Sequence, residues 1–178
     1  LGAMYFLLRG TPFIYQGQEL GMTNFERKSI DEFNDISSID QYYRSIQEGL
    51  SEEEALKVIN LRSRDNSRTP FPWNSSEYGG FSKVKPWLGM IENYKEINAE
   101  AQVGQDDSIY EFYKKMIDFR QNSIYSECLI YGNITAIDTE NDEVIAYTRK
   151  GGNETIYCYF MTNSNPVISI FLFTFANR

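Results

Sequence analysis

The spacing of apolar residues changes near Cys128, and this change constrains the fold more than any other feature of the chain. From residue 109 to about residue 123, apolar side chains recur at helical spacing and form one apolar face. Beyond Cys128 the period becomes two, which is typical of half-buried strands. Strands are predicted at residues 129–138, 144–150, 155–161 and 167–174, with turns at Asn141-Asp142 and Gly151-Gly152-Asn153. The pattern therefore predicts a helical part followed by an antiparallel sheet.

Local signals predict where the helices begin and end. Ser51 and Glu54 have the spacing of a capping box, and Ser108 and Glu111 repeat that spacing before the longest helix. Gly10 is the expected carboxyl-terminal cap of the first helical segment. Residues 64–85 contain several prolines and glycines and are predicted to be irregular. The predicted helices are residues 1–8, which read as the end of a helix, then 40–48, 52–61 and 109–123.

A short apolar run at residues 12–15 has the profile of a buried parallel strand. Residues 16–19 (QGQE) follow it at once and place polar groups at its carboxyl end. In barrel enzymes, that end of the strands carries the chemistry. Residues 17–39 show no sustained period and many polar side chains, which predicts a long loop of the kind that is usually functional.

A second segment, residues 62–74 (RSRDNSRTPFPWN), concentrates charge in a chain whose net charge is −8. Three arginines and one aspartate stand close together at its start. Such a cluster is typical of places where polar groups are held in a fixed geometry. The segment then becomes stiff and aromatic, with two prolines, Phe71 and Trp73.

Further segments accompany these two in a fixed order. They are residues 21–36 (GMTNFERKSIDEFNDI), 79–88 (GGFSKVKPWL), 93–102 (NYKEINAEAQ) and 107–120 (DSIYEFYKKMIDFR). Together with RDNSRTP, their order and spacing resemble the C-terminal part of an α-glucosidase of the α-amylase superfamily, in the oligo-1,6-glucosidase group. The resemblance extends to about Asn163 and fades beyond it.

This resemblance implies a fold of the class α/β plus all-β. Residues 1–124 would be the C-terminal part of a TIM (β/α) barrel, with the last strand, helices and long loops. Residues 125–178 would be an incomplete antiparallel β-domain of the kind that follows such barrels. Because a barrel requires all of its strands, we expect the isolated chain to be marginally stable or unstable. The apolar run at residues 168–175 departs from the family, and we expect a truncation or a change of reading frame there.

The resemblance also implies an activity, the retaining, exo-acting hydrolysis of terminal α-linked glucose from short oligosaccharides of the isomaltose or maltose type. The family's aspartate nucleophile, glutamate acid/base and second aspartate would all precede Leu1. We therefore assign no catalytic residue to this chain and expect it to be inactive alone. Trehalose-6-phosphate hydrolase and sucrose isomerase share much of the pattern and remain alternatives, as does a non-catalytic barrel relative that serves as an interaction module.

Three residues are candidate substrate-binding residues, with roles implied by the resemblance. Arg64 opens the RDN motif and would lie at the bottom of the pocket for the non-reducing glucose, paired with an upstream aspartate. Ser37 stands where oligo-1,6-glucosidases commonly have a glutamate, beside the leaving sugar, which leaves the linkage preference open. Arg68 is the third candidate, although a scaffolding role beside Trp73 is favoured for it. A scaffolding role is also favoured for Asp65.

Composition and charge argue against several classes of protein. A sequence pI near 4.7 disfavours nucleic acid and anionic membranes as partners. No apolar run approaches the roughly 20 residues that a membrane helix needs. There is no histidine, and Cys128 and Cys158 are expected to be reduced and packed, so no metal site and no cofactor are expected. We expect a cytoplasmic protein with an oligosaccharide substrate, and its oligomeric state stays open.

Overall fold

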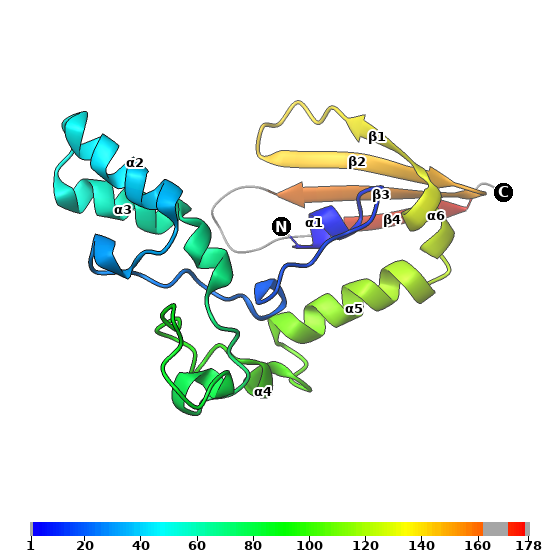
Figure 1. Ribbon diagram of the computed structural model, residues 1–178. Helices are drawn as coiled ribbons and strands as arrows, with labels where there is room; N and C mark the ends of the chain where they lie inside the picture. Colours follow the sequence, from blue (N-terminus) through cyan, green and yellow to red (C-terminus); the bar gives the residue numbers. More distant parts are fainter. Residues whose placement is uncertain (1, 162–170, 177–178) are drawn as a thin grey trace. The chain divides into compact units, whose positions relative to one another are not determined.

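An antiparallel sheet forms the period-two part of the chain, as the alternation predicted (Figure 1). The structure, a computed structural model, describes residues 2–161 and the backbone of residues 171–176. The strands are β1 (Asn133–Ile137), β2 (Val144–Gly151), β3 (Glu154–Met161) and β4 (Phe171–Ala176), paired in chain order. The register places Tyr147 opposite Cys158. Of the strand predicted at residues 167–174, residues 171–174 belong to β4, and residues 167–170 lie outside the described part.

The chain divides into two compact units. Of the described residues, one unit combines residues 2–13 with residues 112–161 and 171–176, and the other comprises Ile14–Glu111. The first unit contains the sheet, α1 (Gly2–Phe6), α6 (Ser126–Tyr131) and most of α5 (Ile109–Asn122). The second contains α2 (Ile36–Gln47), α3 (Glu52–Arg62), α4 (Ala99–Gln102) and the short 3-10 turns η1 (Gln18–Leu20), η2 (Ile30–Glu32), η3 (Arg64–Arg68) and η4 (Glu77–Gly80). The domain boundary predicted after residue 124 concerns the complete protein and stays a prediction.

Residues 129–131 are helical, so the prediction that a strand begins at residue 129 is wrong. They belong to α6, and β1 begins only at Asn133. Cys128 and Leu129 are at most 1% exposed and pack into the core of the first unit. A short apolar run fits a buried helix as well as a strand, which is why the periodicity misled here. Gly132 permits the turn that follows, because a Cβ there would overlap the carbonyl oxygen of Cys128.

The core of the first unit lies between the sheet and its helices. Its buried members are Ala3, Leu7, Cys128, Leu129, Tyr147, Ile156, Cys158 and Phe160. Both cysteines are free and buried, which confirms the prediction of reduced, packed thiols. Burial raises the pKa of both thiols, that of Cys158 to about 11, so they stay protonated at neutral pH.

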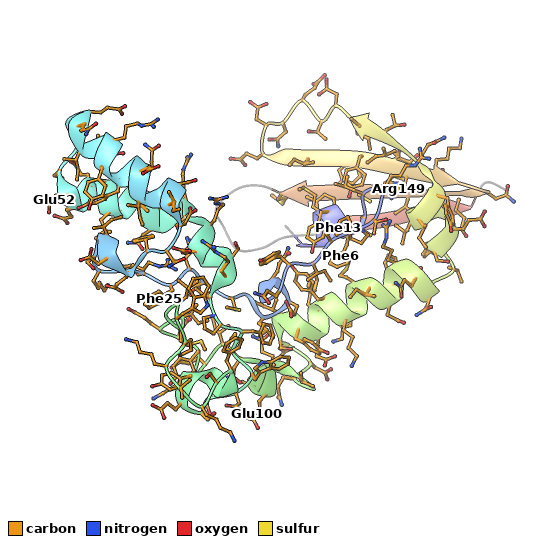
Figure 2. All side chains as sticks on the ribbon, in the orientation of Figure 1. Phe6, Phe13, Phe25, Glu52, Glu100 and Arg149 are labelled. Atoms are coloured by element: carbon orange, nitrogen blue, oxygen red, sulfur yellow. The ribbon has the colours of Figure 1, made fainter. Side chains whose placement is uncertain are left out.

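Two buried arginines, Arg120 and Arg149, hold the end of α1 and the residues after it; Figure 2 labels Arg149 and Phe6. Arg120 Nη1 donates to the carbonyls of Phe6 and Leu8 at 2.6 and 3.0 Å. Arg149 Nη1 donates to the carbonyl of Leu7 at 2.6 Å. The last carbonyls of a helix have no partner within the helix, so Arg120 replaces the missing bond at Phe6. The bonds to Leu7 and Leu8 fix the residues that follow α1.

Residues 12–15 do not form a strand, contrary to the prediction. Phe13, Ile14 and Tyr15 are 85%, 38% and 56% exposed, so the run is not buried either. A parallel strand takes its backbone hydrogen bonds from neighbouring strands. Within the described residues, the strands pair only with one another in the antiparallel sheet. The apolar run therefore has no strand to pair with and forms no regular secondary structure.

The starts of α3 and α5 follow their local signals closely. α3 starts at Glu52 as predicted, and the capping box of Ser51 and Glu54 is complete. Ahead of α5, the Ser108 hydroxyl accepts the amide of Glu111 at 3.1 Å. α2 and α3 pack against each other around a buried cluster of Phe33, Tyr42, Ala55 and Ile59.

One helix start was predicted wrongly. α2 begins at Ile36 rather than at residue 40. The amides of Asn34 and Asp35, just before the helix, donate to the buried carboxylate of Asp65 at 2.7 and 3.0 Å. Asp65 is remote in the sequence, so the spacing of residues around the helix start does not indicate that it supports the backbone there.

Candidate functional site

Arg64 and Asp35 form the central contact of a polar cluster in the second unit. Arg64 Nε and Nη2 lie 3.1 and 2.6 Å from Asp35 Oδ1. Nη2 also donates to Ser37 Oγ at 3.1 Å. The Asp35 carboxylate is 4% exposed, whereas the Arg64 side chain is 71% exposed. The structure thus brings together two of the predicted site residues, Arg64 and Ser37, beside one buried carboxylate.

Two helix starts create this contact. Asp35 is the N-cap of α2, and Ser37 lies in the first turn of that helix. Arg64 opens η3, directly after α3 and its cap Ser63. The family resemblance implied an aspartate upstream of the chain as the partner of Arg64. In the structure its carboxylate partner is Asp35, a residue of the same chain.

The electrostatics of the pair favour its charged form. The Arg64 guanidinium lowers the pKa of Asp35 to about 2, the Ser38 hydroxyl assists, and burial of the carboxyl opposes the shift. The same carboxylate raises the pKa of Arg64. Both groups therefore stay charged at ordinary pH. Because Arg64 is mostly exposed, solvent screens the pair and limits its contribution to stability.

Asp65 fixes the backbone beneath the cluster. It is fully buried, and besides the amides of Asn34 and Asp35 its carboxylate accepts a hydrogen bond from Arg68. The guanidinium carbon of Arg68 lies 5.8 Å from the ring centre of Trp87. Trp87 is therefore an aromatic neighbour of Arg68. The expected packing of Arg68 on Trp73 stays a prediction. Asp65 and Arg68 thus hold neighbouring backbone and side chains in place, which agrees with the scaffolding role favoured for both residues.

Two buried serines, Ser38 and Ser63, were not predicted to belong to the site and complete the cluster. Ser38 Oγ lies 2.7 Å from Asp35 Oδ2 and 2.9 Å from Ser63 Oγ. Both serines are 6% exposed. A local signal existed, because Ser38 follows Asp35 by three residues and Ser63 precedes Asp65 by two, spacings at which side chains bond locally. The link between the two serines is tertiary and had no such signal.

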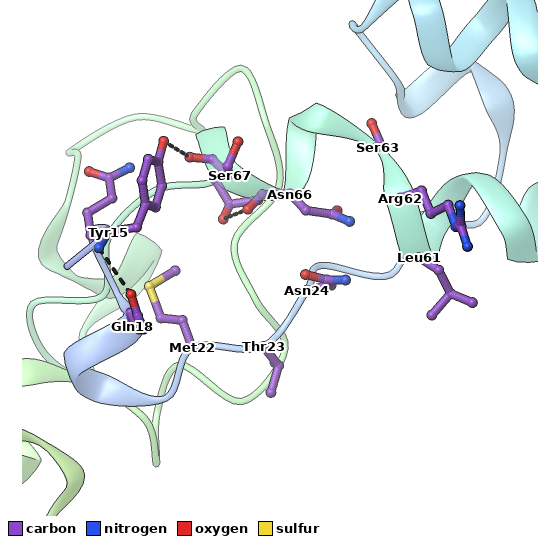
Figure 3. A pocket seen from close by; sticks show the side chains of 12 residues that line it. Tyr15, Gln18, Met22, Thr23, Asn24, Leu61, Arg62, Ser63, Asn66 and Ser67 are labelled. Atoms are coloured by element: carbon purple, nitrogen blue, oxygen red, sulfur yellow. Dashed lines mark hydrogen bonds between the residues drawn. The ribbon is translucent and has the colours of Figure 1, made fainter. Parts of the chain in front are cut away.

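A cavity of about 390 Å³ lies between residues 15–24 and residues 61–69 (Figure 3). Most of its lining side chains carry amides or hydroxyls, which both donate and accept hydrogen bonds as sugar hydroxyls do. The Tyr15 hydroxyl donates to the Ser67 carbonyl across it at 2.8 Å. The three predicted site residues, Arg64, Ser37 and Arg68, are not among its lining residues.

A second cavity of about 500 Å³ lies between residues 24–28 and α3. Arg27 stands at its edge and is 1% exposed, which lowers its pKa through burial. Its guanidinium lies 5.3 and 4.8 Å from the rings of Phe25 and Phe33, and Nη1 donates to Asn66 at 2.8 Å. These contacts connect the loop of residues 24–28 to the RDN motif, residues 64–66.

The described residues form no metal site and no membrane-spanning helix. Among the side chains that the structure describes, in residues 2–161, no three that could hold a metal ion gather in one place. In the same part of the chain, no helix has the length and apolar character needed to cross a bilayer.

Most of the chain matches one protein family. Residues 1–132 match the family described as Alpha amylase, catalytic domain. The protein named Probable oligo-1,6-glucosidase 3 of Bacillus subtilis is 46% identical over 155 residues, which are 87% of this chain and 27% of that protein. The trehalose-6-phosphate hydrolase of Bacillus subtilis is 37% identical over 150 residues, which are 84% of this chain and 26% of the relative.

Solved structures of isomaltulose synthases are also similar to this chain. An isomaltulose synthase from a Klebsiella species superposes with a TM-score of 0.84 at 40% identity, covering 93% of this chain and 30% of that one. An isomaltulose synthase from Erwinia rhapontici, solved with its natural substrate sucrose, gives a TM-score of 0.81 at 39% identity. That match covers 90% of this chain and 28% of the synthase. The chain therefore spans less than a third of the length of the proteins it resembles.

Proposed function

Since the chain belongs to the α-amylase family, as part of its TIM-barrel catalytic domain with a small C-terminal antiparallel sheet, we propose that it is a segment of an exo-acting α-glucosidase. The enzyme would release terminal α-linked glucose from short oligosaccharides of the isomaltose or maltose type, with retention of configuration. The 46% identity to a protein named as an oligo-1,6-glucosidase supports this choice. In this proposal the enzyme acts in the cytoplasm and needs no cofactor.

One observation carries the proposal, an exposed guanidinium that a buried carboxylate holds in place. Arg64 engages Asp35 and Ser37 through Nε and Nη2. Its Nη1 makes no hydrogen bond to another described residue, so that edge of the fork is open to a ligand. A neutral sugar is recognised by directed donors and acceptors rather than by net charge. An anchored arginine supplies such donors in a fixed direction.

The two carboxylates of a retaining glycosidase flank the bond that is broken. We place both in the part of the enzyme outside this chain. Acidic groups near Arg64 already have partners: Asp35 holds the guanidinium, and Asp65 holds backbone amides. Glu32, in η2, also has a partner, because it accepts the amide of Lys28 at 3.1 Å. The chain alone is therefore expected to leave an aryl α-glucoside unhydrolysed.

Ser37 bears on which linkage is cut. It contacts Arg64 and, in this proposal, borders the leaving sugar. A serine reaches less far than a glutamate and carries no charge, so preference for α-1,6 linkages is expected to be weak. Hydrolysis of trehalose-6-phosphate and isomerisation of sucrose are the alternatives, because relatives named for the first and for isomaltulose synthesis are 37% and 40% identical. The RDN cluster around Arg64 favours any of these over a non-catalytic interaction module.

Arg64→Ala in the complete enzyme tests the proposal. We expect kcat/KM for isomaltose and maltose to fall by about 100-fold, which is typical when one hydrogen-bond donor is removed from the active site of an enzyme. Arg44→Ala is the matched control, because Arg44 is exposed on α2 and should leave kcat/KM unchanged. Turnover of isomaltose, maltose, sucrose and trehalose-6-phosphate, measured side by side, identifies the substrate. No turnover of any of them by the wild type would refute an enzymatic role, and an unaffected Arg64→Ala would refute the assigned sugar site.

A further inference from the structure

The carboxylate that holds Arg64 is itself held at its second oxygen. Asp35 Oδ1 receives the guanidinium, and Oδ2 lies 2.7 Å from Ser38 Oγ. The backbone amide of Asp35 is also fixed, by Asp65 at 3.0 Å. A carboxylate bound on one oxygen alone can rotate about its Cβ–Cγ bond, whereas one bound on both cannot rotate without breaking a bond. The direction of the exposed Arg64 side chain thus depends on contacts buried beneath it.

The donors in this cluster can be ordered from their chemistry. An ionised carboxylate only accepts, so the Ser38 hydroxyl proton must point to Asp35 Oδ2. The hydrogen bond between Ser38 and Ser63, whose oxygens are 2.9 Å apart, must then use the proton of Ser63. Ser63 Oγ in turn accepts the amide of Asp65 at 3.1 Å. A chain of bonds therefore runs from Asp65 through Ser63 and Ser38 to Asp35, and every bond points towards the carboxylate. Such chains strengthen each member.

We propose that Ser38 is a positioning residue for sugar recognition, which acts through Asp35 to aim Arg64 at the substrate. The proposal rests on the proposed function, because it needs Arg64 to contact a sugar. Ser38 is 6% exposed and lies under the Arg64–Asp35 pair, so it has no route to the ligand of its own. Its contribution is the fixed orientation of the carboxylate, and displacements of about 1 Å in a binding site can cost up to about 100-fold in rate.

The test is Ser38→Ala in the complete enzyme, with substrate kinetics as the first readout. We expect kcat/KM for the preferred α-glucoside to fall by roughly tenfold, a part of the loss caused by removing Arg64 itself. Ser38→Thr keeps the hydroxyl and should retain most of the activity. Ser45→Ala is the matched control: Ser45 lies two turns along the same helix, is 5% exposed and bonds Gln41 instead. It should leave kcat/KM unchanged.

A double-mutant cycle separates positioning from general loosening of the fold. If Ser38 acts through Arg64, adding Ser38→Ala to Arg64→Ala should lower kcat/KM no further. Independent, additive losses would overturn the proposal, as would equal effects of Ser38→Ala and Ser45→Ala. A strong effect of Arg64→Ala without any effect of Ser38→Ala would refute this inference and leave the proposed function standing. No effect of Arg64→Ala would refute the proposed function instead.

A second readout does not need turnover. Carbon-13 NMR of the Asp35 carboxyl, followed in acid, should show its pKa above about 2 in Ser38→Ala, because a hydrogen bond to the charged form is lost. Ser45→Ala should leave it unshifted, and an unshifted value in Ser38→Ala would count against the proposal. If Ser38→Ala fails to fold, Ser63→Ala serves in its place. This variant keeps the hydrogen bond from Ser38 to Asp35 but removes the hydroxyl of Ser63 that donates to Ser38. A loss of about threefold is expected there, and no loss would overturn the proposal.

Discussion

The carboxylate of Asp65 accepts the backbone amide of Asp35 at 3.0 Å, and this contact ties the start of α2 to the RDN segment. The same oxygen accepts the amide of Asn34 at 2.7 Å. Asp65 is fully buried, so water cannot replace it as the acceptor. Two segments that are remote in the sequence are thereby held together, and Arg64 and Ser37 meet as a consequence.

Asp65→Asn should destabilise the protein by about 2 to 4 kcal/mol. The amide keeps the shape of the side chain but loses the charge that the two backbone amides and Arg68 require. Urea unfolding, followed by tryptophan fluorescence, measures the change. Asp40→Asn, at an exposed position of α2, is the control and should shift the midpoint little. Equal midpoints for the two variants would show that Asp65 is not the anchor.

The Arg64–Asp35 pair predicts how stability depends on pH. The pKa of Asp35 is lowered to about 2, against about 3.9 in an unfolded chain. The contribution is therefore complete above about pH 4 and is lost as the pH falls towards 2. We expect the wild type and Arg64→Ala to differ by a constant, small amount from pH 5 to pH 8, and to converge between pH 4 and pH 2. Melting temperatures across this range check it, and a gap that widens in acid would contradict the assigned pair.

Much of the fold could be predicted because its determinants are local. The capping box at Ser51 fixes the start of α3 with residues three apart, and the alternation in β2 and β3 follows from side chains that face opposite sides of a sheet. The failures have remote determinants. The start of α2 depends on Asp65, and residues 12–15 could be a strand only with neighbouring strands to pair with.

The candidate site also has residues that could be predicted from the sequence and contacts that could not. The family resemblance pointed to Arg64 and Ser37, and the structure places them within one hydrogen bond of each other. Asp35 as the partner of Arg64, and the bond from Ser38 to Ser63, were not predicted. A hydroxyl in a sequence gives no sign of what it will meet across the fold, because most serines are exposed.

Ser37→Glu should change the linkage preference of the complete enzyme. A carboxylate at this position would lie close to Arg64 and could accept hydrogen bonds from two hydroxyls of the leaving sugar. We expect the ratio of kcat/KM for isomaltose to that for maltose to rise. Ser37→Gln has the same length without the charge and should raise the ratio less. An unchanged ratio in both variants would mean that this position does not reach the leaving sugar.

Arg149 offers a test of how the first unit is held together. It is fully buried, and its guanidinium donates to the carbonyls of Leu7, Cys128 and Gly132 at 2.6, 3.1 and 2.8 Å. Arg149→Met fills much of the same space but leaves three carbonyls without this donor. We expect a loss of about 3 kcal/mol or more in the free energy of unfolding.

Lys150→Met is the matched control for Arg149→Met. Lys150 is the next residue of β2, is exposed and also loses a cation to methionine. A surface change of this kind usually alters stability by about 0.5 kcal/mol or less. Urea unfolding followed by circular dichroism should therefore move the midpoint strongly for Arg149→Met and barely for Lys150→Met. Similar shifts for both would mean that the loss of charge matters, rather than the three buried carbonyls. A strong effect confined to Arg149 would show that this side chain joins α1, α6 and the sheet.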